Sequence, residues 1–102
     1  MTIGEHLLQI AGAGLALSDV NVDEEVYTHL TVLLAIEDAL DQGRTSLALT
    51  GSGTEYLGEI NTKMDRLRNK IRQLIEQCDK EEFLHFIESR GNRLKSQFSA
   101  SL

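Results

Sequence analysis

The chain has 102 residues and a formal net charge of −6; 41% of its residues are hydrophobic and 25% are charged. This length predicts one domain, because a chain of about 100 residues rarely encloses two separate hydrophobic cores. The composition excludes disordered, collagen-like and membrane-embedded classes and is typical of an ordinary globular chain.

The charges are distributed unevenly along the chain. Residues 1–59 carry ten acidic residues and one base, whereas residues 60–102 carry nine bases and six acidic residues. The acidic excess argues against a protein dedicated to binding nucleic acid. The two halves can attract each other within the fold, or they can face different partners.

Cysteine usage and the N-terminal residues bear on the compartment. The single cysteine, Cys78, cannot form an intramolecular disulfide, so we expect a reducing compartment, the cytoplasm. Glu5 stands where a secretory signal would need Lys or Arg, and we expect no export signal. The longest apolar runs, 10–17 and 32–36, are shorter than the roughly 20 residues that cross a bilayer.

Apolar spacing predicts a first helix over residues 3–17. Its stripe consists of Ile3, Leu7, Ile10, Gly14 and Leu17. Each interior glycine costs about 1 kcal/mol of helix stability relative to alanine. Residues 11–14 therefore predict a thin, partly frayed helix, with a close helix crossing or a hinge as the alternative.

A second helix is predicted to follow a polar break at 18–21, with Asn21 or Asp23 as its cap, and to run to about Asp41. Its core stripe is Val26, Leu30, Leu33, Ile36 and Leu40. The apolar run 32–36 predicts burial on more than one side, which is typical of a central helix. Gly43 is predicted to end the helix, and residues 44–54 are predicted to form a flexible loop.

The third helix has the clearest pattern. Its apolar residues are spaced alternately three and four apart, and we call them the heptad seam: Leu57, Ile60, Met64, Leu67, Ile71, Leu74 and Cys78. This pattern predicts a long helix with a coiled-coil-like face. If the heptad seam is exposed it favours a homodimer, because soluble monomers rarely leave such a patch uncovered; burial within the monomer is the alternative.

A capping box formed by Asp79 and Glu82 predicts the start of a fourth helix. Its stripe would be Phe83, Ile87, Leu94 and Phe98, and residues 90–92 are predicted to end or bend it. The expected fold is therefore all-α, a small bundle of three to four helices in a single domain over residues 1–102.

Motifs for catalysis and cofactor binding are incomplete. The glycines of residues 50–54 lack the lysine of a phosphate-binding loop. Glu82 and His85 have the spacing of a di-iron ligand pair, but a second such pair is missing. Cys78 lies at a seam position, where a thiol behaves as a small hydrophobic group. We expect no enzyme, no cofactor and no metal site.

The strongest charged feature is a group of five bases in ten residues: Lys63, Arg66, Arg68, Lys70 and Arg72. Lys63, Arg68 and Lys70 flank the heptad seam and suit a helix that carries acidic residues. The chain itself contains such a helix, with its acidic residues at 37–41. Arg66 and Arg72 lie farther from the seam and form the alternative, a nucleic-acid-binding face.

These patterns predict a small acidic protein-interaction module: an intracellular adaptor, chaperone-like binder or inhibitor that works through helical apolar surfaces. The partner would be another protein or a second copy of the chain. The alternative function is a nucleic-acid-associated regulator that uses the basic stretch 63–72.

Overall fold

The computed structural model describes residues 2–20, 25–51 and 54–88. The helices are α1 (Ile3–Ser18), α2 (Val26–Thr50), α3 (Leu57–Glu76) and α4 (Lys80–Glu88), with a short 3₁₀ helix η1 (Thr54–Tyr56) before α3. These ranges contain no strand. The expected all-α class is confirmed.

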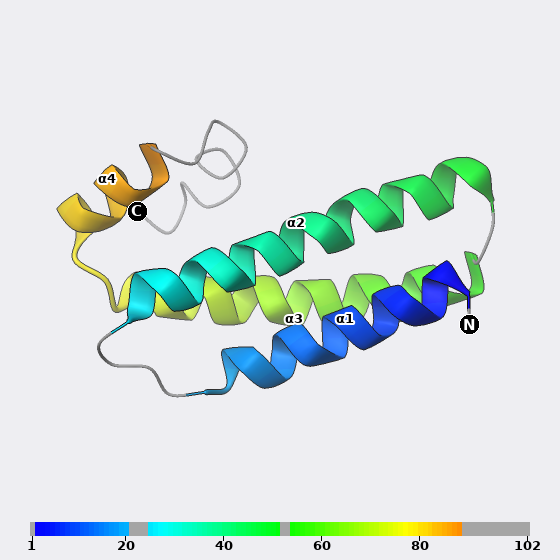
Figure 1. Cartoon of the computed structure of the whole chain (residues 1–102), viewed down its shortest axis with the longest axis horizontal. Helices are drawn as coiled ribbons and strands as arrows, with labels where there is room; N and C mark the ends of the chain where they lie inside the picture. The colour runs from blue at the N-terminus through cyan, green and yellow to red at the C-terminus, as the bar shows by residue number, and fades with distance from the viewer. Residues whose placement is uncertain (1, 21–24, 52–53, 89–102) are drawn as a thin grey trace.

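The three long helices lie side by side, and each packs against both of the others (Figure 1). The direction of α2 is opposite to that of α1 and α3, and α4 folds back at the end where α2 begins and α3 ends (Figure 1). Because α1 and α3 also contact each other, α2 is not the central helix that the run 32–36 predicted.

All four α-helices contribute to one hydrophobic core. Its buried members are Leu7, Ala11, Leu30, Leu33, Leu34, Leu40, Leu47, Ile60, Met64, Leu67, Ile71, Ile75, Phe83 and Ile87. Of the stripe predicted for the second helix, Leu30, Leu33 and Leu40 are fully buried, while Val26 and Ile36 are half-buried.

The predicted stop at Gly43 is wrong. α2 continues to Thr50, and Gly51 ends it in the left-handed conformation with φ of 69°. Residues 44–50 are therefore helical rather than part of a loop. A Cβ added at Gly43 would lie 2.5 Å from Leu7 Cδ2, so this glycine permits the close approach of α1 and α2.

The glycine-rich part of α1 has a similar explanation. The helix is continuous through residues 11–14, and a Cβ added at Gly14 would lie 2.9 Å from Ile36 Cγ2. The close-crossing interpretation therefore replaces the frayed helix. Nothing lies within 4 Å of a Cβ added at Gly12, so only one of the two glycines serves this contact.

Side-chain caps are present at two helix starts. The Thr2 hydroxyl oxygen accepts a hydrogen bond from the Glu5 backbone N–H at 3.2 Å. The Asp79 carboxylate accepts one from the Glu82 N–H at 3.1 Å, which confirms Asp79 as the cap of α4. The Glu82 carboxylate, the other half of the predicted capping box, accepts from the Tyr27 hydroxyl.

Other sequence predictions for the helix ends differ or go untested. Glu25 occupies the N-cap position of α2 without a side-chain cap bond. The predicted cap residues Asn21 and Asp23 lie outside the described residues, as do Leu94, Phe98 and the predicted bend at 90–92.

Candidate interaction surface

The heptad seam is largely covered within the monomer. Ile60, Met64, Leu67 and Ile71 are fully buried, and Leu57, Leu74 and Cys78 are half-buried against the core. An exposed seam was the physical reason to expect a homodimer through α3. The burial of these side chains against α1, α2 and α4 removes that reason.

Near the end of α3, the buried positions no longer follow the heptad seam. Ile75, which is not a seam residue, is buried, whereas Leu74 is only half-buried. An α-helix has 3.6 residues per turn, so a stripe that repeats every 3.5 residues drifts around a straight helix. After several turns the buried position has moved from Leu74 to Ile75.

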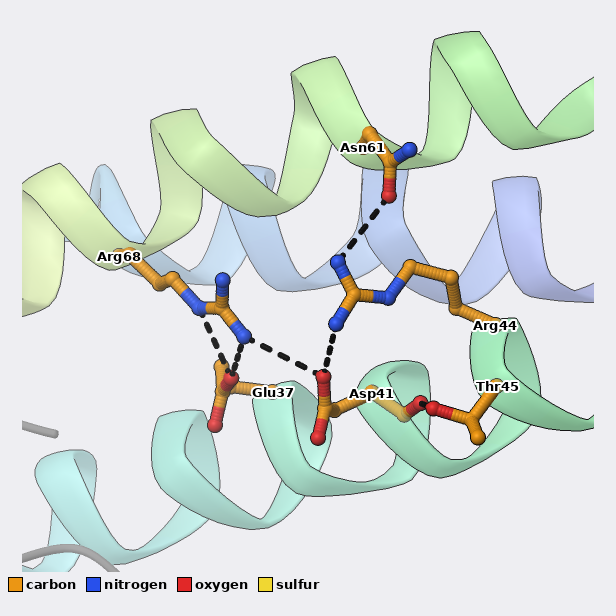
Figure 2. Close-up of polar contacts among 6 residues, drawn as sticks. All are labelled: Glu37, Asp41, Arg44, Thr45, Asn61 and Arg68. Atoms are coloured by element: carbon orange, nitrogen blue, oxygen red, sulfur yellow. Dashed lines mark hydrogen bonds and ion pairs between the residues drawn. The ribbon is translucent and has the colours of Figure 1, made fainter. Parts of the chain in front are cut away.

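A polar network joins α2 to α3 within the body of the molecule (Figure 2). Glu37 is fully buried, and its Oε1 accepts hydrogen bonds from Arg68 Nε at 3.0 Å and Nη2 at 2.8 Å. Arg68 Nη2 also reaches Asp41 Oδ1 at 3.4 Å. Arg44 donates to Asp41 and, at 3.2 Å, to Asn61 Oδ1.

This network decides the role of one base that flanks the seam. A carboxylate out of contact with water requires a charged, hydrogen-bonded partner, and Arg68 supplies it. The acidic helix that suits Arg68 is therefore provided by the same chain. Lys70 likewise pairs with Asp19, just beyond the end of α1.

The remaining bases do not form one common face. Lys63 is half-buried, Arg66 is exposed, and Arg72 is half-buried with a hydrogen bond from Nη1 to Asn69 Oδ1 at 3.3 Å. Arg66 and Arg72 are six residues apart, which places them about 120° apart around a helix with 3.6 residues per turn. The predicted nucleic-acid face thus divides between two sides of α3.

Cys78 lies in a small cluster where α3, α4 and the start of α2 meet. Its Sγ donates to the Leu74 carbonyl at 3.3 Å, and the Tyr27 hydroxyl donates to Glu82 Oε2 at 3.3 Å. Partial burial raises the pKa of Cys78, and the nearby Glu82 carboxylate raises it further. A thiol that resists deprotonation is a poor nucleophile.

The candidate metal ligands of the sequence can be located in the described ranges. No group of three or more His, Cys, Asp or Glu side chains within them could hold a metal ion. Glu82 and His85, the di-iron-like pair of the sequence, are both exposed on α4. Glu82 is instead occupied by the hydrogen bond from Tyr27.

Apolar residues remain exposed where α1 and α2 lie next to each other. α1 carries one charged residue, Glu5, and residues 6–18 carry none; residues 26–36 of α2 carry none either. We define the α1–α2 face by its exposed residues, which are Ile3, Ile10 and Ala13 on α1 and Val32 and Ala39 on α2. Ile3 is 68% exposed, Ile10 38% and Val32 42%.

The helix contacts fix where these residues lie. Leu7 meets Gly43, and Gly14 meets Ile36, so these four positions mark the line along which α1 and α2 touch. Ile3 and Ile10 lie within one turn of Leu7 and Gly14 along α1. Val32 and Ala39 lie within one turn of Ile36 and Gly43 along α2. The exposed residues therefore border the contact line on its outward side.

Sequence reasoning missed this surface. It assigned Ile3 and Ile10 to the core stripe of the first helix, and it counted Val32 within a run buried on several sides. The signal that could have revealed it is the absence of charge over 13 residues of α1, more than one buried stripe requires.

Comparisons with protein-family models, curated proteins and solved structures found no match for this chain. Among the described residues, no helix combines the length and the apolar character needed to span a membrane.

Proposed function

We propose that the protein is a small protein-interaction module that binds its partner through the α1–α2 face. The observation that carries this proposal is the set of exposed apolar residues on two neighbouring helices, of which Ile10, Ala13 and Val32 lie in stretches free of charged residues. Scattered apolar side chains are normal on a protein surface, but neighbouring ones that share a face are typical of binding sites.

The role is that of an adaptor, chaperone-like binder or inhibitor rather than an enzyme. Its support is that the α3 seam and the Arg68 and Lys70 side chains are used within the monomer, whereas α1 and α2 keep apolar side chains exposed next to each other. We place this binding in the cytoplasm, for which the single cysteine, unable to form an intramolecular disulfide, is the support.

A matched pair of variants tests the surface. Ile10→Asp puts a charge on the α1–α2 face, and Leu84→Asp puts one on α4 at a residue of equal exposure, 39% against 38%. The tagged full-length chain and both variants are expressed in the source cell, and the co-purifying proteins are quantified by mass spectrometry. We expect Ile10→Asp alone to lose a protein that the unchanged chain retains.

The same experiment separates the alternatives. Recovery of an untagged copy of the chain as the dominant partner would identify a homodimer. Nucleic acid that co-purifies and is lost on nuclease treatment would favour the regulator. Identical protein profiles for both variants would contradict binding through the α1–α2 face.

A further inference from the structure

The fourth helix is attached to the molecule differently from the other three. Each pair among α1, α2 and α3 packs closely, whereas α4 makes no comparably extensive contact with any of them and lies at the end where α2 begins and α3 ends (Figure 1). We propose that α4 is a hinged cover, which opens from a three-helix bundle that stays folded, and that Tyr27 holds it closed. This proposal is independent of the α1–α2 face.

The connection to α3 separates α4 as a unit. Residues 77–79 lie between the two helices, and the cap at Asp79 starts α4 anew. α4 has nine residues, and an isolated helix shorter than about 12 residues is marginal in water. The hydrogen bonds of α4 therefore depend on docking, so its backbone amides lose their protection from hydrogen exchange when the cover opens.

Two kinds of contact hold α4 against the bundle. Phe83 and Ile87 lie four residues apart on one side of the helix, and each is 1% exposed within the core. Beside them, the Tyr27 ring lies 5.2 Å from the Phe86 ring, and the Tyr27 hydroxyl donates to Glu82 Oε2 at 3.3 Å. Glu82 and Phe86 are also four residues apart, so one side chain of α2 contacts a whole turn of α4.

The bundle keeps most of its buried contacts when α4 opens. Apart from Phe83 and Ile87, every buried core residue belongs to α1, α2 or α3. Opening α4 therefore gives up fewer contacts than unfolding the molecule, and the two events differ in free energy. The open form exposes apolar surface that the closed form covers. Any binding to that surface is weakened in proportion to the fraction of molecules that are open, which makes the cover a regulatory device.

Two tyrosines provide a matched pair of variants. The Tyr27 hydroxyl donates to Glu82 of α4, and the Tyr56 hydroxyl donates to Glu5 Oε1 of α1, also at 3.3 Å. Tyr27→Phe weakens the closed form alone. Tyr56→Phe weakens the closed and open forms equally, because its contact lies outside α4. Amide hydrogen exchange of the full-length chain, measured by mass spectrometry, therefore distinguishes opening of α4 from unfolding of the whole molecule.

We expect the amides of residues 83–88 to exchange about threefold faster or more in Tyr27→Phe, and at an unchanged rate in Tyr56→Phe. Phe86→Ala, which removes the ring beside Tyr27, should accelerate their exchange by about tenfold or more. Low concentrations of urea should leave this exchange nearly constant while they accelerate that of residues 60–71, because opening α4 exposes less surface than global unfolding.

Equal acceleration of α4 exchange in the two tyrosine variants would show that α4 opens only when the whole chain unfolds, and it would overturn the proposal. A parallel response of α4 and residues 60–71 to urea would do the same. Unchanged exchange in Tyr27→Phe would overturn it as well, whatever the effect of Phe86→Ala. Circular dichroism checks that each variant folds.

Discussion

Glu37 and Arg68 show how a charged pair is accommodated in a small helical core. The Glu37 carboxylate is fully buried, and Arg68 contacts it through two nitrogens while remaining partly open to solvent. Removing a single partner from such a pair leaves an uncompensated buried charge, which costs more than the pair itself contributes.

Arg68→Ala should therefore destabilise the fold by about 3–5 kcal/mol in urea unfolding, because Glu37 loses its charged partner. Arg66→Ala, an exposed residue on the same helix, should change stability by less than about 0.5 kcal/mol. Replacing Glu37 and Arg68 together by leucine should restore much of the loss. Equal effects of the two single substitutions would contradict a structural role for the pair.

Tyr27 provides a second prediction at the scale of a residue. Partial burial, together with the neighbouring Cys78 and Glu82 groups, raises its pKa from 10.0 to about 12. The chain has two tyrosines and no tryptophan, so Tyr56→Phe leaves one phenol for ultraviolet titration. We expect its ionisation midpoint near pH 12; a midpoint near pH 10 would contradict the partial burial of Tyr27 beside Cys78 and Glu82.

The sign of the linked stability follows from the direction of this pKa shift. The folded state favours the neutral phenol, so the contribution of Tyr27 is complete below about pH 10, the ordinary tyrosine value. It is lost as the pH rises from about 10 through about 12. Tyr27→Phe should reduce the loss of stability over that interval.

Among the elements, the contact between α1 and α2 depends on small residues. Gly43→Ala should destabilise the protein, because overpacking against Leu7 costs about 1–3 kcal/mol while the gain in helix propensity is at most about 1 kcal/mol. Gly12→Ala meets no neighbouring atom and should stabilise α1 by about 0.5–1 kcal/mol. Thermal melts that show the same sign for both would contradict the close crossing.

The periodicity of apolar residues predicted the presence of all four helices, but it did not predict where α2 ends. A glycine that ends a helix and a glycine that permits a crossing look the same in one sequence, and Gly43 is of the second kind. Leu47 anchors the last turns of α2 in the core and continues the seven-residue spacing of Leu33 and Leu40. This spacing was the available signal for the longer helix.

The candidate surface was harder to predict than the helices. Apolar residues on a helix can be assigned to a stripe, but which part of a wide stripe is covered depends on where the neighbouring helices pack. On α1, Leu7 and Gly14 face α2 while Ile10, from the same predicted stripe, is left partly exposed. On α3 the same uncertainty applied to the heptad seam, which packing buried.

In the molecule as a whole, the acidic and basic halves of the chain meet within the monomer. Arg68 binds Glu37 and Asp41, and Lys70 binds Asp19, so bases from residues 60–102 neutralise acidic residues from 1–59. The formal net charge of the whole chain is −6, and these pairings do not change it, because each joins one positive and one negative group. These pairings leave less of the basic stretch available to a polyanion.

We therefore predict no binding of DNA or RNA at physiological salt. Anisotropy titrations with labelled duplex DNA and single-stranded RNA over a range of salt concentrations provide the measurement. Reversing Arg66 and Arg72 to Glu should then change nothing. Salt-sensitive binding by the unchanged protein that disappears in this double variant would support the nucleic-acid-associated regulator instead.

Binding through the α1–α2 face is tested most directly by a photo-cross-linking amino acid placed at residue 10, with residue 84 as the control at equal exposure. Irradiation in the source cell followed by mass spectrometry identifies what each residue touches. The proposed module predicts one discrete protein adduct from residue 10 that residue 84 does not form. No adduct from residue 10, or the same adducts from both residues, would contradict it.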